Sequence, residues 1–449
     1  MNSIDRRKFL ILSAATAAFS TCPELAFSQG IGTSAPFSDY RALVCVFLFG
    51  GNDSFNMVVP KSDAEYNVYA TSRQNLAIDQ SALLDINPIT FDGARYGLHP
   101  SMGGIQSLFD SNRAAIVSNV GPLIEPTTKD QFQNNSVLLP PQLFSHNDQQ
   151  DQWQSLKGRA QSNTGWAGRV ADLIRSNVVD QQMATNSSLF DNVLFQSADD
   201  TVAYVMGASG PVKFEGFDGN IFSQEQRLAF ESIINASYSS IYERGFAEIQ
   251  RRAVAASDLV NDAIAGAPIL DTQFPASQLG TQLNTVARLI AVRDQLQMQR
   301  QVFFVAAGGF DSHDNQNLHQ PELLGGISDA LSAFYDATVE IQAADMVTTF
   351  TQSDFGRTLT SNGDGTDHAW GGNQLIIGDA VRGGDMYGTF PRLEIDGPDD
   401  VRGGRMIPTT SADQYAATLA KWFGIPDSEL DIVAPNIGNF GIRDLGFLV

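Results

Sequence analysis

The sequence predicts an α/β protein with a mostly parallel central sheet and helices on both of its faces. Three apolar, β-branched runs support this class, at 43–49, 302–307 and 347–351. Each run is apolar throughout, which is typical of strands that are buried on both faces. Stretches with helical spacing separate these runs, and such alternation favours a parallel sheet. The 449 residues are 43% hydrophobic and 17% charged, so the chain can bury a large core.

The first part of the chain is expected to alternate between strand and helix. The run 43–49 mixes β-branched and aromatic residues, as central buried strands do. A helix-like stretch at 102–111 precedes a short strand at 114–118. Apolar residues at helical spacing predict a helix at 165–177. Residues 61–100 and 127–142 show no firm periodicity, and we expect irregular structure there.

Residues 178–275 differ in character, and we expect a helical elaboration over the sheet in this region. Ser223 and Gln226 have the spacing of a capping box. Apolar residues then recur at helical spacing over 228–259, which predicts two helices or a helical hairpin. The pattern stops at the Gly-Ala-Pro of 266–268. The elaboration serves either as a cap that shapes substrate access or as peripheral packing.

The last third returns to the alternation of the first. Pro321 suits the first turn of a helix. The expected elements are a helix at 279–300, a strand at 302–307, a helix at 321–343, strands at 347–351 and 374–377, and a helix at 412–423.

Residues 1–28 are expected to be a twin-arginine signal peptide, and residues 29–449 a single α/β domain. Arg6 and Arg7 precede an apolar stretch that is too short to serve as a permanent membrane anchor. Ala26 and Ser28 provide the small residues that a signal peptidase requires. A twin-arginine signal implies export of a folded protein to the periplasm or beyond.

Charge and cysteine content exclude several classes of protein. The formal net charge is −22, which argues against binding of nucleic acid or of an anionic membrane. Removal of the signal peptide, which carries a net charge of +1, would leave −23. Of the two cysteines, Cys22 lies in the expected signal peptide, so a disulfide framework is excluded. Outside the signal peptide, no apolar run is long enough for a transmembrane anchor.

Acidic residues follow three of the predicted strands in Gly- or Ser-containing loops. Asp53 comes after 43–49, Asp311 after 302–307 and Asp354 after 347–351. Because loops at the carboxyl ends of parallel strands gather at one edge of a sheet, these carboxylates are expected to converge. A cluster of this kind is costly unless a cation or a shared proton offsets the repulsion. The pattern therefore favours a metal site.

Histidines strengthen the metal hypothesis. The chain has only five, and two of them accompany loop aspartates: His313 follows Asp311 closely, and His368 follows Asp367 in a Gly-rich loop. Imidazole with carboxylate suits zinc, manganese or iron, whereas an all-oxygen set suits calcium or magnesium. The expected cofactor is a divalent ion, zinc, manganese or calcium. The expected ligands are Asp53, Asp311, His313, Asp354 and His368. Taken singly, each of these residues could also be a loop cap.

Three further residues are candidates for catalysis. Ser145 is one possible nucleophile, with His146 as its general acid or base; hydroxide on the metal is the other. Arg357 could clamp an anionic group of the substrate, or it could form an internal ion pair. The sequence has no Gly-x-Ser-x-Gly elbow, Walker loop, His-Glu-x-x-His motif or dinucleotide fingerprint. These absences disfavour common serine esterases, nucleotide hydrolases, zincin proteases and Rossmann dehydrogenases.

Five segments together resemble the domain of unknown function 1501 family, whose members are often exported by the twin-arginine route. The segments are 49–56, 145–153, 309–313, 353–358 and 367–371. That family is similar to the alkaline phosphatase and sulfatase superfamily, which implies a three-layer α/β/α fold. The resemblance assigns Asp53 to the first metal aspartate, Asp311 and His313 to the middle pair, Asp354 to an Asp-His dipeptide and His368 to the late histidine.

This chain departs from the superfamily pattern at two points. Phe355 stands where the histidine of the dipeptide would be, so a second metal would lack a ligand. The nucleophile has no secure counterpart, since Ser145 matches by order alone.

Three functions fit these observations. The leading hypothesis is an exported, metal-dependent hydrolase of phosphate or sulfate esters, acting on an anionic small molecule or polysaccharide. The alternative is a non-catalytic exported protein of the cell envelope that uses the same fold for binding. The third is a metal-dependent enzyme with different chemistry on a carbohydrate or polymer. The oligomeric state is not predicted.

Overall fold

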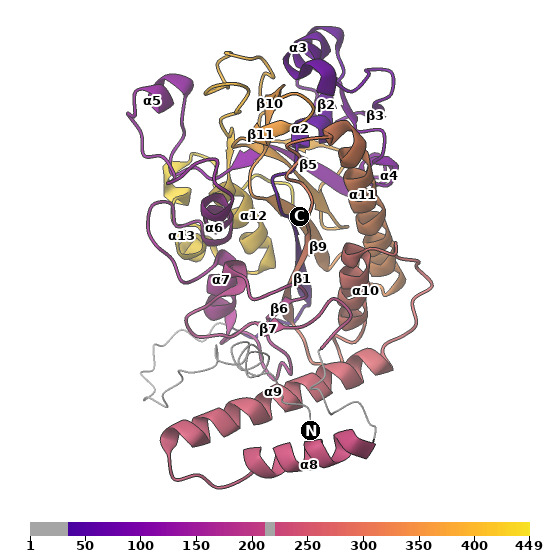
Figure 1. Cartoon of the computed structure of the whole chain (residues 1–449), viewed down its shortest axis with the longest axis vertical. Helices are drawn as coiled ribbons and strands as arrows, with labels where there is room; N and C mark the ends of the chain where they lie inside the picture. The colour runs from indigo at the N-terminus through magenta and orange to yellow at the C-terminus, as the bar shows by residue number, and fades with distance from the viewer. Residues whose placement is uncertain (1–34, 212–220) are drawn as a thin grey trace.

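The computed structural model describes residues 35–211 and 221–449 (Figure 1). The expected signal peptide, residues 1–28, lies outside the described residues. The strands are β1 (Arg41–Leu48), β2 (Val58–Pro60), β3 (Leu84–Ile86), β4 (Tyr96–Leu98), β5 (Ala114–Gly121), β6 (Asn186–Ser188), β7 (Tyr204–Val205), β8 (Arg300–Ala307), β9 (Val347–Ser353), β10 (Arg357–Ser361), β11 (Thr366–His368), β12 (Gly372–Ile377), β13 (Met386–Tyr387) and β14 (Thr410–Ser411). The α-helices are α2 (Ser54–Met57), α3 (Asp63–Arg73), α4 (Gly103–Asp110), α5 (Lys129–Gln133), α6 (His146–Ser155), α7 (Trp166–Ile174), α8 (Ile221–Ile234), α9 (Ile241–Gly266), α10 (Gln278–Ala291), α11 (Gln316–Glu340), α12 (Ala412–Phe423) and α13 (Leu430–Val433).

The central sheet of the described chain is mostly parallel. Its strands lie in the order β13-β5-β12-β9-β1-β8-β6-β7, with β14 beside β5. β1 pairs in parallel with β8 on one side and with β9 on the other. β12, the strand expected at 374–377, is antiparallel to both of its neighbours, β5 and β9. The predicted fold class, an α/β protein with a mostly parallel sheet, is confirmed.

Helices cover both faces of this sheet, so the molecule has three layers. Alternate residues of β1 enter different cores, as the two-residue period of a strand requires. Val44 and Val46 pack in one core with α4, α10 and α11. Cys45 and Phe47 pack in the other with α7, α12 and α13. Figure 1 shows the two groups of helices on opposite sides of the sheet. This burial on both sides explains why the run at 43–49 is apolar throughout.

Several expected elements differ from the structure. α11 begins at Gln316, so Pro321 lies inside the helix and not in its first turn. α10 ends at Ala291, whereas its apolar spacing had predicted a helix to 300. β6 and β7 fall within the stretch that we expected to be helical, and they extend one edge of the central sheet. α3 and α5 lie in the two stretches that we expected to be irregular.

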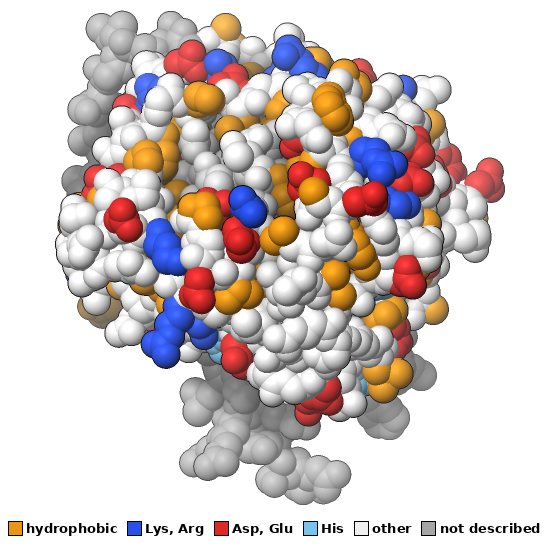
Figure 2. All heavy atoms as spheres, turned by 90° about the horizontal axis from the view of Figure 1, so that it is seen from above, with side chains coloured by type: hydrophobic (Ala, Val, Ile, Leu, Met, Phe, Trp, Pro, Cys, Tyr) orange, Lys and Arg blue, Asp and Glu red, His pale blue; other side chains and the backbone are white. Residues whose placement is uncertain are grey.

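The helical part of the expected elaboration consists of α8 and α9, which pack against each other. Figure 1 shows this pair at one end of the molecule, opposite α3 and β10. In the described part of the chain, no helix combines the length and the apolar character that crossing a membrane requires. Figure 2 looks onto the opposite end, where acidic, basic and hydrophobic side chains are interspersed over the visible face.

Candidate metal centre

Three neighbouring strands end together at the edge of the sheet where the candidate site lies. Leu48, the last residue of β1, pairs in register with Ala307 of β8 and with Ser353 of β9. The loops that follow these strands therefore leave the sheet at the same edge. Asp311 and Asp354 lie in two of these loops, so both can reach one site. The first residue of α6 and the β10–β11 hairpin complete the site with His146 and His368.

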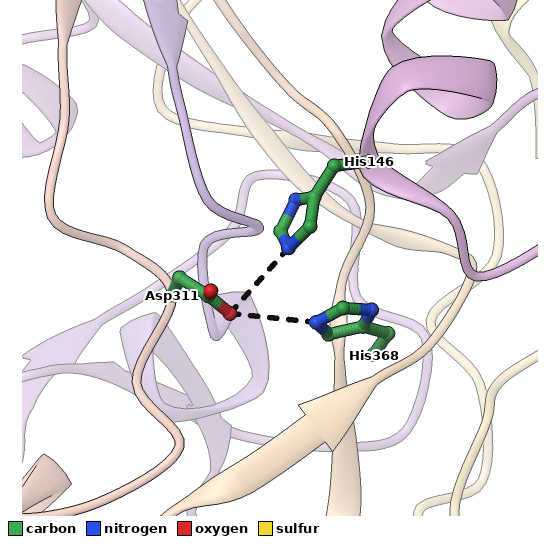
Figure 3. Close-up of side chains that lie close together, drawn as sticks. All are labelled: His146, Asp311 and His368. Atoms are coloured by element: carbon green, nitrogen blue, oxygen red, sulfur yellow. Dashed lines mark ion pairs between the residues drawn. The ribbon is translucent and has the colours of Figure 1, made fainter.

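His146, Asp311 and His368 form a group that could hold a metal ion. One ligand atom from each lies within 4.8 Å of the other two. The Nε2 atoms of His146 and His368 are 3.5 Å and 3.4 Å from Asp311 Oδ1. Figure 3 shows both rings turned toward this carboxylate from different segments of the chain. The two histidine side chains are about one-quarter exposed, at 27% and 26%, so the group is open to solvent on one side.

Hydrogen bonds on the far side of each ring determine which nitrogen faces Asp311. His146 Nδ1 lies 2.6 Å from Asp354 Oδ2, and His368 Nδ1 lies 2.8 Å from the carbonyl oxygen of Phe144. Because a carboxylate and a carbonyl only accept, we assign the Nδ1 proton to both rings. In the neutral form each Nε2 then carries a lone pair, and both lone pairs point toward Asp311.

This arrangement fits a divalent cation. Two imidazole lone pairs and a carboxylate oxygen face one another, and the Nε2 of His146 is buried without a hydrogen bond. Such acceptors need a cation or a proton between them. Two nitrogens and one oxygen suit zinc, manganese or iron better than calcium. The carboxylate and the carbonyl behind the rings match the outer partners that orient histidine ligands.

Arg357 holds Asp311 in place. Its side chain is fully buried, and Nη1 donates to Asp311 Oδ1 at 2.8 Å and to the Gly50 carbonyl at 3.1 Å. Nε and Nη2 donate to Thr366. Burial acts to raise the pKa of Asp311, but the hydrogen bond and charge of Arg357 outweigh it and lower that pKa. The structure thus shows the internal ion pair, which was the second of the two roles expected for Arg357.

His313 lies at the exposed rim of the group. Its Nε2 is 2.9 Å from Asp311 Oδ1 and 3.0 Å from His368 Nε2, and its side chain is 45% exposed. On the other side, its Nδ1 is 3.4 Å from Asp367 Oδ1. His313 therefore joins the expected cluster, although it does not belong to the group of three mutually close ligands.

Asp354 contacts His146 on the side of the ring opposite to Asp311. Its side chain is fully buried, and Oδ2 accepts from His146, from the backbone N–H of Gly50 at 3.2 Å and from Gln150 Nε2 at 3.0 Å. This hydrogen bond to Asp354 raises the pKa of His146, whereas burial lowers the pKa of His368. The geometry gives Asp354 the position of a residue that orients a ligand, in place of the ligand role expected for it.

Asp53 is engaged elsewhere. Its carboxylate forms a buried ion pair with Arg73 and accepts a hydrogen bond from Gln316, and both charged side chains are at most 1% exposed. The backbone carbonyl of Asp53 also accepts from Gln320. A guanidinium of the protein itself therefore neutralises the carboxylate that was expected to bind the metal.

Ser145 and His146 were expected as nucleophile and general acid or base, and the structure gives their side chains different partners. Ser145 precedes α6 as its N-cap residue, and its hydroxyl donates to Asp148 Oδ2 at 2.6 Å. His146, the first residue of the helix, turns its ring to Asp354 and Asp311. The two side chains thus have separate partners.

Sequence reasoning missed four supporting groups: Arg73, Gln150, Gln316 and the carbonyl of Phe144. None of the motifs that suggested the metal site includes Arg73 or Gln316. Gln150 stands one turn after His146 on α6, so helical spacing could have indicated that both face the same loop. The Phe144 carbonyl is a backbone group, which no side-chain pattern reveals.

The chain belongs to the family described as "Protein of unknown function (DUF1501)", whose model matches residues 40–425. The membership that the five segments predicted is therefore confirmed. No curated protein matches the chain.

Solved structures of the alkaline phosphatase superfamily are among those similar to this chain. One is a protein in that superfamily from Vibrio parahaemolyticus, with 10% identity over 94% of this chain and 76% of the other, at a TM-score of 0.34. The lipoteichoic acid synthase LtaP from Listeria monocytogenes shares 8% identity over 92% and 78%, also at 0.34. A third is Ps i-CgsB in complex with k-i-k-neocarrahexaose, with 9% identity over 90% and 77%, at 0.34.

Proposed function

We propose that this member of the DUF1501 family is an exported, metal-dependent hydrolase of phosphate or sulfate esters. One observation carries the proposal: two histidines with protonated, hydrogen-bonded Nδ1 atoms turn their Nε2 lone pairs toward the same oxygen of Asp311. Arg357 already donates to this oxygen, and His313 Nε2 lies 3.0 Å from His368 Nε2. The buried Nε2 of His146, however, has no hydrogen-bond partner in the described chain, and a cation at this point would supply one. The partly exposed side chains of the group make it accessible from solvent.

His146, Asp311 and His368 would hold the ion. A divalent ion held there would supply Lewis-acid polarisation of an ester oxygen and would lower the pKa of a bound water. The protein positions these ligands through Asp354 behind His146, the Phe144 carbonyl behind His368 and Arg357 beside Asp311. Asp354 and Arg357 are fully buried and Phe144 is half-buried, so the ligands would be held before any substrate arrives.

Water is the proposed nucleophile, because the Ser145 hydroxyl is bound to Asp148. Attack by water on phosphorus or sulfur forms a new bond to the water oxygen and breaks the bond to the leaving oxygen. The attacking water releases a proton to solvent, and the leaving oxygen takes up a proton. His313 is placed to deliver it, since its imidazole is exposed at the rim and touches Asp311. This assignment gives His313 a catalytic role instead of the ligand role expected from the sequence.

The proposed substrate is an anionic ester on a small molecule or a polysaccharide. Arg357 is buried and fully engaged, so we assign the substrate anion to Arg405. Arg405 is half-buried; its Nε donates to the His368 carbonyl at 2.9 Å, and its guanidinium lies over the ring of Phe144. We propose export by the twin-arginine route, which rests on residues 1–28 of the sequence alone.

Metal analysis of the protein, purified from an exporting host without chelator, tests the proposal. We expect on the order of one divalent ion per chain, and at least about a 10-fold loss in His146→Ala and His368→Ala. His319→Ala is the matched control, because His319 is an exposed histidine on α11 and is not one of the three residues of the group. A panel of phosphate and sulfate esters then measures turnover, which a chelator should abolish and added metal should restore.

The results separate this function from the alternative. Absence of metal from the wild-type protein, or full metal content in both alanine variants, would rule out the proposed site. Metal binding without turnover of any ester would favour a metal-dependent enzyme with different chemistry, whereas absence of both metal and turnover would favour the non-catalytic binding protein. Two observations favour that alternative: the Ser145 hydroxyl is engaged by Asp148, and Arg73 neutralises Asp53.

A further inference from the structure

Gln316 is a buried glutamine at the start of α11, next to the candidate metal centre. It is the first residue of the helix, and its side chain has no exposed surface. Its oxygen Oε1 accepts from the hydroxyl of Ser312 at 3.2 Å and from the hydroxyl of Thr366 at 2.7 Å. Ser312 directly follows Asp311, and Thr366 is the first residue of β11, which contains His368. One oxygen atom therefore joins the two segments that supply Asp311 and His368.

The same two segments also meet directly, and one of them leads on to Asp311. The backbone N–H of Thr366 donates to the carbonyl oxygen of Ser312 at 2.9 Å. The Thr366 hydroxyl accepts from Nε of Arg357 at 3.2 Å, and Nη1 of that arginine donates to Asp311 Oδ1 at 2.8 Å. A hydroxyl can donate one hydrogen bond and accept another at the same time. The amide of Gln316 is therefore connected to Asp311 by a continuous chain of hydrogen bonds.

The nitrogen of the same amide determines how the side chain is oriented. Nε2 of Gln316 donates to Oδ2 of Asp53 and to Oε1 of Gln320, the latter at 3.2 Å. Because a carboxylate only accepts hydrogen bonds, the nitrogen must face Asp53 and the oxygen must face the two hydroxyls. Arg73 supplies the opposite charge that a buried carboxylate requires, since its guanidinium pairs with Asp53. The buried ion pair thus fixes which end of the amide meets the two segments.

We propose that Gln316 is a positioning residue, which holds the Asp311 loop against β11 and thereby sets the separation of Asp311 and His368. Asp53, which was expected to bind the metal, instead orients the amide of this residue. A glutamine suits the position because its tip has both a donor and an acceptor. Glutamate would turn a second carboxylate toward Asp53, and methionine would offer no donor and only a weak acceptor. The effect on metal binding rests on the proposed metal site, whereas the contact between the two segments is present without an ion.

Isothermal titration of the full chain with zinc tests the effect of this contact on binding. Gln316→Met keeps the length of the side chain and removes its amide, and we expect the zinc dissociation constant to rise at least about 10-fold. Thr366→Val removes the hydroxyl at the other end of the contact and should weaken zinc binding as well. The double variant should lose less affinity than the two single losses combined, because both substitutions break the same contact.

Gln320→Met is the matched control. Gln320 is a second buried glutamine on α11, and its Nε2 donates to the backbone carbonyl of Asp53 at 2.9 Å. This substitution should destabilise the protein in urea, because buried hydrogen bonds are lost, and should leave the zinc affinity near the wild-type value. Amide hydrogen exchange of the metal-free protein measures the contact itself. Exchange over 366–368 should be faster in Gln316→Met and unchanged in Gln320→Met.

The outcomes distinguish this role of Gln316 from the metal site. Unchanged zinc affinity together with unchanged exchange in Gln316→Met would overturn the role, and so would equal effects of the two methionine substitutions. A wild-type protein that binds no zinc would contradict the proposed metal site, and exchange in the metal-free protein would still decide whether Gln316 holds the two segments together. If circular dichroism shows that Gln316→Met does not fold, Thr366→Val takes its place in both measurements.

Discussion

In the proposed metal site, Asp354 contacts a candidate ligand and does not belong to the group of three itself. Its Oδ2 accepts three hydrogen bonds, and the shortest comes from the ring of His146. A carboxylate in this position holds the imidazole in one tautomer and makes its other nitrogen a stronger donor to a metal. The sequence shows only that an aspartate follows a strand, and it does not show which atom the carboxylate meets.

Asp354→Asn should weaken metal binding about 10- to 100-fold while the fold is retained, because the amide keeps the size of the side chain but loses its charge. Competition with a chromogenic chelator measures the affinity. Thermal unfolding of the metal-free protein measures stability separately.

Asp148→Asn is the control for this substitution. Asp148 lies in the first turn of the same helix, α6, and contacts Ser145. If both asparagine variants bind metal as tightly as the wild-type protein, Asp354 has no part in orienting His146.

The candidate ligands themselves were more predictable than their supports. Asp311 and His368 were predicted as ligands because each stands in a loop next to a strand end or in a Gly-rich turn, and they meet, with His313 beside them, as expected. His146 was expected as a general acid or base, and its place among the candidate ligands was not predicted. Asp53 had the same sequence signature, yet it pairs with Arg73, which lies at the end of α3. Nothing in the spacing of the two residues distinguishes this buried ion pair from a metal ligand.

At the scale of elements, two loops must approach closely to form the site. Gly365 lies between β10 and β11 and touches the loop that carries Asp311 and His313. A Cβ atom at this position would be 2.2 Å from the carbonyl carbon of His313 and 2.5 Å from the Ser312 oxygen. Both neighbours are backbone atoms, which cannot move aside as a flexible side chain can.

Gly365→Ala should therefore push the β10–β11 hairpin away from the Asp311 loop. His368 lies on this hairpin, so its distance from Asp311 should grow and metal affinity should fall at least about 10-fold. Overpacking of this kind typically costs about 1–3 kcal/mol of stability.

Isothermal titration with zinc and urea unfolding check these two effects of Gly365→Ala. Gly326→Ala is the control, since Gly326 lies in α11 with nothing within 4 Å of its added Cβ. Unchanged zinc affinity in Gly365→Ala would mean that the two loops do not need this contact.

Other elements show which sequence patterns were sufficient to predict a strand or a helix. β1, β8 and β9 were predictable because burial on both faces makes a strand continuously apolar. β6 and β7 were missed because they have only three and two residues, too few for a periodic pattern. Pro321 suggested a helix start, but the first turn of α11 begins earlier, after Asn315 in the left-handed conformation.

At the scale of the whole molecule, two buried ionisable groups make stability depend on pH in opposite directions. Burial lowers the pKa of His99 to about 4, against an ordinary value of 6.5. Burial also raises the pKa of Asp413 to about 7 from 3.8, although hydrogen bonds from Asn436 and the charge of Arg169 oppose the shift. Neither residue belongs to the candidate metal centre.

The signs follow from proton binding in the two states. Between pH 6.5 and 4, unfolded His99 is protonated and folded His99 is not, so its contribution to stability is lost as the pH falls. Between pH 7 and 4, folded Asp413 is protonated and unfolded Asp413 is ionised, so stability rises as the pH falls. Each group changes the free energy of unfolding by up to about 1.4 kcal/mol per pH unit, and the two effects largely cancel.

Single substitutions should expose this cancellation. Below pH 6.5, His99→Gln should become relatively more stable as the pH falls, and Asp413→Asn should become relatively less stable, each compared with the wild-type protein. Urea unfolding at half-unit steps from pH 4.5 to 7 measures the slopes. His319→Gln, at an exposed position, should follow the wild-type curve. Parallel curves for all four proteins would contradict the assigned pKa shifts.

If the proposed ion binds, the aligned ends of β1, β8 and β9 would also determine when it can be acquired. His146, Asp311 and His368 belong to separate parts of the chain, and they meet only after strands far apart in sequence have paired. Long-range pairing of this kind is slow, because the entropy cost of bringing distant segments together must be met before any stabilising contact forms. Loading would therefore be the last event of maturation, and a chain that carries its ion would be one whose sheet is already complete.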